Sequence, residues 1–79
     1  MNRAELDRAL LDAHATGDNV ALVRLYTLAA DQAELAQDID AACFYLTHAF
    51  VFALEAGVPE ADGLNRRLAE QGRAHRLTF

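Results

Sequence analysis

The chain has 79 residues, of which 53% are hydrophobic and 24% are charged, and its formal net charge is −5. This composition is typical of one globular domain and excludes an intrinsically disordered chain. A domain of this size buries only about 60% of the surface that its unfolded chain exposes. A monomer is therefore marginal, and self-association as a homodimer would add stability.

Charge is divided along the chain. Residues 1–62 contain eleven acidic side chains and three arginines, whereas residues 63–79 contain four arginines and one glutamate. Because an acidic body repels phosphate backbones, we expect no nucleic-acid partner. Alanine dominates the composition and lysine is absent, a bias that is typical of a GC-rich bacterial genome.

The sequence favours a cytoplasmic location. Cys43 is the single cysteine, so no disulfide can form within the chain. We find no apolar run as long as about 18 residues and no signal-peptide pattern at the N-terminus. We therefore expect no membrane span.

The apolar periodicity is helical throughout and predicts an all-α, compact bundle of four helices. The first helix is expected at residues 3–15. Asn2 would cap this helix, and Glu5 stands where a capping box requires it. The Thr16-Gly17 pair is a typical stop signal. The apolar face consists of Leu6, Ala9, Leu10 and Ala13.

The second helix is expected at residues 19–37, with Asp18 as its N-cap. Its apolar face consists of Leu22, Leu25, Tyr26, Ala29, Ala33 and Ala36. The opposite face carries Arg24, Thr27, Asp31 and Glu34. We interpret this charged face as solvated.

The third helix is expected at residues 39–56, after Asp38 as N-cap and with Asp40 favourably placed in the first turn. With about 100° of rotation per residue, one line holds most of its apolar side chains. These are Ile39, Cys43, Leu46, Phe50 and Ala53, and Tyr45 and Phe52 widen the stripe. So broad a stripe predicts a central helix, packed between the second helix and the fourth or the first.

The fourth helix is expected at residues 59–71, starting at Pro59 and stopping at Gly72. Its apolar stripe consists of Ala61, Leu64 and Leu68. We therefore expect one helical domain over residues 1–72, followed by a basic tail at 73–79. The tail could be frayed, fold back on the acidic body or insert into another chain.

Small residues recur along the second and third expected helices, at Ala30, Ala33, Ala42, Leu46 and Ala49. With this spacing, and the Gly-Asp turn in "ATGDNVALVRLY", residues 14–58 resemble the tetratricopeptide repeat. The resemblance implies helical hairpins that bind a peptide or another protein. Because about three repeats are needed for a solenoid, we expect a compact bundle or a dimer.

The third helix has a further face that carries Phe44, His48, Val51 and Glu55. Two interpretations remain open. A neighbouring helix or the tail could cover the apolar members, since most apolar side chains are buried. Alternatively, the four residues form a contact patch for a partner or a second copy, as exposed apolar clusters usually do. They are our candidate partner-binding residues.

The chain shows no arrangement typical of catalysis or of metal binding. Serine is absent, and the three histidines lie on different segments, so neither a serine nucleophile nor a four-ligand zinc site is indicated. Cys43 falls on the expected core face, where a thiol is unreactive. We expect no enzyme activity, no metal and no cofactor.

These features favour a small protein-interaction module, either an adaptor or a self-associating scaffold, that binds through the apolar patch on the third helix. Two alternatives remain. The protein could be an acidic regulator that occupies a basic site on a partner. It could instead be a bundle that encloses a small ligand in a cavity lined by Tyr26, Tyr45 and Phe52.

Overall fold

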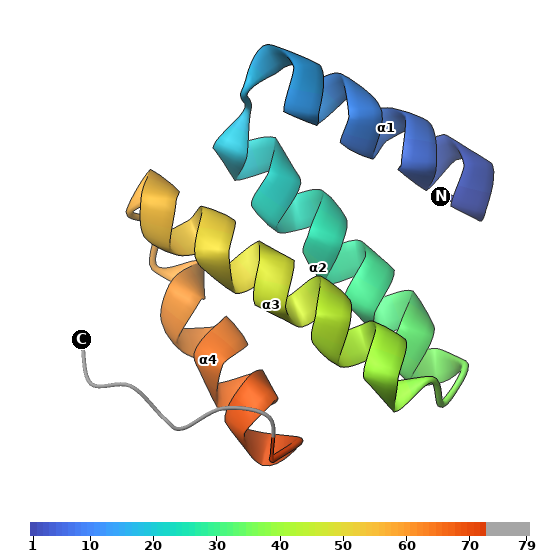
Figure 1. The fold of residues 1–79 in the computed structure, drawn as a ribbon, viewed down its shortest axis with the longest axis vertical. Coiled ribbons are helices and arrows are strands. Elements are labelled where there is room, and N and C mark those ends of the chain that lie inside the picture. Colours follow the sequence, from blue (N-terminus) through green and yellow to red (C-terminus); the bar gives the residue numbers. More distant parts are fainter. Residues whose placement is uncertain (73–79) are drawn as a thin grey trace.

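The structure, a computed structural model, describes residues 1–72 and contains four α-helices and no strand in that range (Figure 1). The helices are α1 (Arg3–Thr16), α2 (Asn19–Leu35), α3 (Ile39–Ala56) and α4 (Glu60–Glu70). The expected all-α, four-helix fold is confirmed. The tail at residues 73–79, with its three possible arrangements, lies outside the described residues.

Side-chain caps begin the first three helices as the sequence predicts. The Asn2 side chain accepts the Glu5 backbone N–H at 2.8 Å, and the Glu5 carboxylate accepts the Asn2 N–H at 3.4 Å, which completes a capping box. Asp18 and Asp38 each accept the backbone N–H of the residue three positions on, at 3.1 Å. These local bonds satisfy N–H groups that have no partner within the helix.

The helix ends follow the glycines where glycines are present. Gly17 ends α1 with φ 68°, and Gly57 ends α3 with φ 67°. No glycine follows α2, which ends at Leu35, two residues earlier than expected. Gln37 adopts the left-handed conformation there, with φ 60°, and this turn directs the chain back toward α3.

The antiparallel pair α2 and α3 forms the centre of the molecule (Figure 1). α1 packs on α2, and α4 packs on α3, so that α3 lies between α2 and α4 as expected. The Cα atoms extend over 32 × 29 × 13 Å. The shortest extent is less than half of either of the others, so the molecule is flat.

Small side chains allow the central pair to approach closely. Ala30 of α2 and Ala42, Ala49 and Ala53 of α3 are each 0% exposed. Leu46 is also 0% exposed, and Cys43, Leu64 and Leu68 are buried in the same cluster. A thiol in such a place packs as a small apolar group, in agreement with the structural role expected for Cys43.

Three residues depart from the expected core. Ala36 was placed on the apolar face of the second helix but is exposed, because α2 ends at Leu35. Ile39 was placed on the buried line of its helix but is 38% exposed, because it is the first residue of α3. Asn65 of α4, which the sequence did not single out, is 1% exposed. No buried side-chain N or O atom among residues 1–72 lacks a hydrogen-bond partner, so the burial of this amide is compensated.

Two of the four residues on the α2 face that we interpreted as solvated, Asp31 and Glu34, also form ion pairs with α4. Arg67 of α4 donates to Asp31 at 2.8 Å and also to Glu34, and so connects α4 to α2. Partial burial lowers the pKa of the Arg67 guanidinium, but the hydrogen bonds to Glu34 and Asp31 outweigh it and the pKa is raised. Two helices that are not consecutive in the chain are thereby joined.

α3 also corrects the expectation that no apolar run is long enough to cross a membrane. It has 18 residues with a mean hydropathy of 1.3, enough for a span by length and composition. Its only charged residues are Asp40 and Glu55. In the fold this helix packs against both α2 and α4, and 28% of it is buried inside the molecule.

Candidate functional site

The four candidate residues Phe44, His48, Val51 and Glu55 lie on one side of α3, and we call them the α3 patch. His48 is the member that also contacts α2, through the ring of Tyr26. Phe44 is 57% exposed and Val51 is 44% exposed. His48 is half-buried and Glu55 is exposed. One interpretation of the sequence was that a neighbouring helix covers the apolar members of this patch. No helix of residues 1–72 covers them.

The aromatic part of the α3 patch is held in place locally. His48 Nδ1 lies 2.9 Å from the Phe44 carbonyl oxygen. Because a carbonyl can only accept, Nδ1 is the protonated donor in this bond. The bond places the His48 ring 4.4 Å from the ring of Phe44, and Tyr45 meets Phe44 edge-on at 5.5 Å.

The α3 patch continues into a cluster of rings that the sequence analysis did not assemble; we call His14, Tyr26, Tyr45 and Phe52 the ring cluster. Tyr26 of α2 is its centre. The Tyr26 ring lies 5.1 Å from His48, 6.3 Å from Tyr45 and 5.9 Å from Phe52, with the last pair stacked at 8°. Side chains from α2 and α3 therefore form one aromatic surface.

α1 closes the edge of the ring cluster at two points. His14 Nε2 and the Tyr26 hydroxyl share a hydrogen bond of 2.9 Å, and the His14 ring lies 5.6 Å from Phe52. Near the other end of α1, Arg3 donates to the Tyr45 hydroxyl at 2.9 Å. Burial, and to a smaller extent the neighbouring Tyr45, raise the pKa of the Tyr26 phenol above 10.0.

Two shallow hollows lie in succession along the α3 patch. The first has a volume of about 370 Å³ and the second about 200 Å³. The first is lined by Asp40, Cys43, Phe44, Thr47 and His48, and the second by Thr47, His48, Val51 and Phe52. The two therefore share a wall formed by Thr47 and His48, while Glu55 lies beyond the second hollow.

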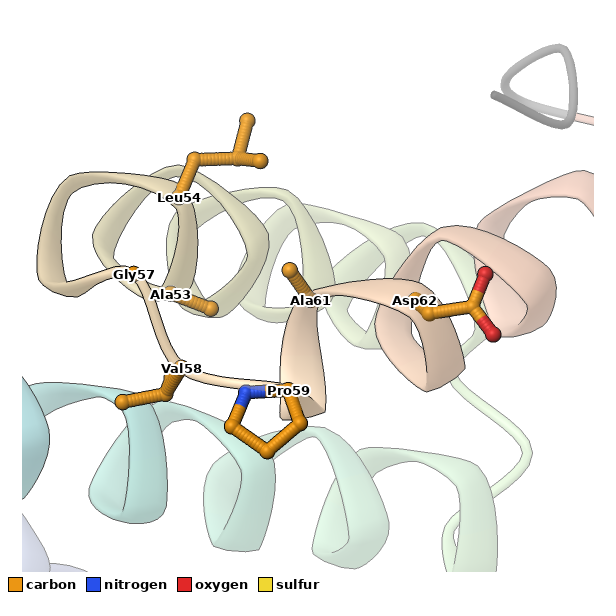
Figure 2. A pocket seen from close by; sticks show the side chains of 7 residues that line it. All are labelled: Ala53, Leu54, Gly57, Val58, Pro59, Ala61 and Asp62. Carbon is orange, nitrogen blue, oxygen red and sulfur yellow. The ribbon is translucent and has the colours of Figure 1, made fainter. Parts of the chain in front are cut away.

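A third hollow, of about 480 Å³, lies at the turn between α3 and α4 (Figure 2). In Figure 2 the small side chains of Ala53 and Ala61 lie between Leu54 and the Val58-Pro59 turn. Asp62 is the one charged residue in its lining, and this carboxylate lies 3.7 Å from Arg66. The lining of this hollow is thus mainly apolar, with one carboxylate at its edge.

A fourth hollow, of about 510 Å³, lies on the outer side of α2. It is lined by Met1, Val23, Arg24, Leu25, Thr27, Leu28, Asp31 and Glu60. Most of its exposed lining is apolar, and Asp31 in its wall already binds Arg67. The sequence analysis did not anticipate this surface, because only the position of α4 brings Glu60 beside α2.

The three residues expected to line a cavity for a small ligand pack together instead of jointly lining one of the hollows described above. These residues, Tyr26, Tyr45 and Phe52, belong to the ring cluster and pack around the Tyr26 ring. Of the four hollows described above, none is lined by all three residues. Within residues 1–72, no three His, Cys, Asp or Glu side chains gather as a metal ion requires.

Comparison with protein-family models, with curated proteins and with solved structures found no match.

Proposed function

We propose that this protein is a small, non-enzymatic protein-interaction module, an adaptor or scaffold, that docks through the α3 patch. The proposal is carried by the exposure of Phe44 and Val51 on one side of a helix that packs against α2 and α4 on others. Exposed apolar clusters of this kind usually mark contact sites. The same two residues are seven positions apart, so that they face a partner from the same side of the helix, with Thr47 and His48 between them.

The surroundings of Phe44 support this proposal. Interface hot spots are rich in aromatic residues and arginine, and here the rings of Tyr45 and His48 pack on Phe44. A side chain that is already confined loses little conformational entropy when a partner covers it. The α3 patch is thus suited to binding without rearrangement.

The tetratricopeptide-like relationship and the cytoplasmic location form part of this proposal. The small residues quoted for the repeat, Ala30, Ala42 and Ala49, are all fully buried, as a helical hairpin of that kind needs. A cytoplasmic globule, rather than a membrane span of α3, is favoured by the packing of α3 against two neighbours and by Asp40 and Glu55 on its exposed side.

The test is replacement of Phe44 by Glu, with Leu35→Glu as the matched control because Leu35 is 87% exposed on another helix. Both variants are expected to keep the wild-type circular dichroism spectrum. Proteins crosslinked to the wild type in its host are identified by mass spectrometry, purified and titrated against each variant. We expect Phe44→Glu to weaken binding at least about tenfold, as loss of a hot spot does, and Leu35→Glu to leave it unchanged. Equal binding to all three proteins would contradict the proposal.

A further inference from the structure

The described part of the molecule has an excess of carboxylates at its surface. Residues 1–72 contain twelve acidic residues and only five arginines. Three of these arginines, Arg3, Arg66 and Arg67, form ion pairs with carboxylates of the chain itself. The surface is therefore electronegative, and it attracts partners of positive charge within a screening length of about 8 Å in physiological salt.

The same imbalance holds for the residues of α3 itself, and the Arg3 guanidinium of α1 that meets Tyr45 is already paired with Asp7. α3 contains Asp40 and Glu55 but no arginine. Glu55 is exposed and lies one turn beyond Val51, at the end of the α3 patch. A partner that covers Val51 therefore comes within reach of this carboxylate.

The charges on α3 argue against a second copy of the chain as the occupant. Two α3 helices packed face to face would place a carboxylate opposite a carboxylate at each end of the contact, and neither helix contains an arginine. Like charges brought together at an interface disfavour that partner. An occupant that supplies its own cations meets no such penalty.

We infer that the partner segment is a basic amphipathic helix, with its apolar side chains in the two hollows and an arginine or lysine beside Glu55. This inference rests on the proposed function of the α3 patch. Phe44 and Val51 lie seven residues apart, about 10 Å along α3, which matches apolar anchors at positions i and i+7 of a helix laid alongside. The two hollows, which share Thr47 and His48, provide adjacent places for such anchors.

The test uses a displayed library of helical peptides with randomised surface positions, selected on the wild-type protein. Each selected peptide is then titrated against Phe44→Glu, Val51→Asp, Glu55→Arg and Glu70→Arg. Glu70 is an exposed residue of α4 and provides the matched control for a charge reversal. Circular dichroism identifies any variant that does not fold, and the two apolar substitutions serve as replacements for each other.

We expect peptides whose binding is lost on Phe44→Glu or Val51→Asp to contain arginine or lysine and apolar residues at helical spacing. Glu55→Arg should weaken these peptides about fivefold, as expected from losing one exposed ion pair and gaining a repulsion, whereas Glu70→Arg should not. If the dependent peptides are neutral or acidic, the inference is wrong but the docking surface stands. If no selected peptide depends on either apolar residue, the proposed docking surface itself is wrong.

Sedimentation of the wild-type protein completes the test of the occupant. We expect a monomer at 100 µM protein, since like-charged helices disfavour pairing. A dimer at that concentration that dissociates on Phe44→Glu would overturn the inference, because a second copy would then occupy the α3 patch.

Discussion

Gln37 shows how a single residue bears the strain of a turn. The loops after α1 and α3 place glycine in the left-handed conformation, whereas the loop after α2 places Gln37 there, with φ 60°. A side chain with a Cβ atom costs about 1–2 kcal/mol in this conformation. The turn between the two central helices is therefore the least favourable of the three interhelical loops.

Replacing Gln37 by Gly should stabilise the protein. Relief of the left-handed strain outweighs the greater entropy of glycine in the unfolded chain, and we expect a gain of about 0.5–1 kcal/mol in the free energy of unfolding. Urea denaturation followed by circular dichroism measures this gain. Gln37→Val should be destabilising, and a stabilised valine variant would show that the turn is not strained.

Tyr26 makes the free energy of unfolding depend on pH in the alkaline range. Because burial raises the pKa of this phenol above 10.0 in the folded state, the folded protein keeps a proton that the unfolded chain releases. The free energy of unfolding should therefore fall as the pH rises above about 10. Tyr26→Phe also removes the hydrogen bond with His14.

For Tyr26→Phe we expect a loss of about 1 kcal/mol at pH 7, the value of an ordinary hydrogen bond, and a shallower decline above pH 10. Denaturation midpoints measured between pH 7 and pH 11 compare the variant with the wild type. An unchanged alkaline decline would show that Tyr26 does not titrate differently on folding.

At the scale of the elements, Arg67 determines how α4 sits on the central pair. α4 packs against α3 through Leu64 and Leu68, while Arg67 binds Asp31 and Glu34 of α2. Apolar contacts are not directional, so they alone would let α4 rotate or slide on α3 at little cost in free energy. The guanidinium bonds are directional and select one orientation.

Arg67→Met keeps much of the side-chain volume and removes the charge. We expect it to lower the free energy of unfolding by about 1 kcal/mol, as for a partly buried ion-pair network, and to speed amide hydrogen exchange in α4 before the rest of the fold. Arg66→Met, which removes a more exposed pair with Asp62, is the control and should have almost no effect. Equal exchange in both variants would argue against the Arg67 connection.

At the scale of the whole molecule, the flat shape decides which apolar residues remain accessible. With a shortest extent of 13 Å, α3 has neighbours at its sides but no second layer above its outward side. Phe44, Val51 and Leu54 are exposed for this reason. A globular bundle with two full layers would have covered a helix as apolar as α3, whose mean hydropathy is 1.3.

Much of the fold and part of the site could be predicted because they depend on near neighbours in the chain. The caps at Asn2, Asp18 and Asp38 involve residues three positions apart, and helical periodicity placed Leu64 and Leu68 in the core correctly. The α3 patch was identified in the same way, since Phe44 and Val51 must share a side of any helix that contains both. Because no glycine marks the end of α2, the second helix was predicted to end two residues beyond Leu35, its actual last residue.

The amino-acid sequence by itself determined the four helices, their caps and the residues that share each helix side, because hydrogen bonds and side-chain directions within a helix are local. Only the tertiary structure decided that Arg67 binds α2, that Asn65 is buried and that Ile39 is exposed. It also brought Tyr26 into contact with His14, Phe52 and His48. These outcomes depend on how whole helices pack and cross, and side chains far apart in the chain meet only once that packing is established.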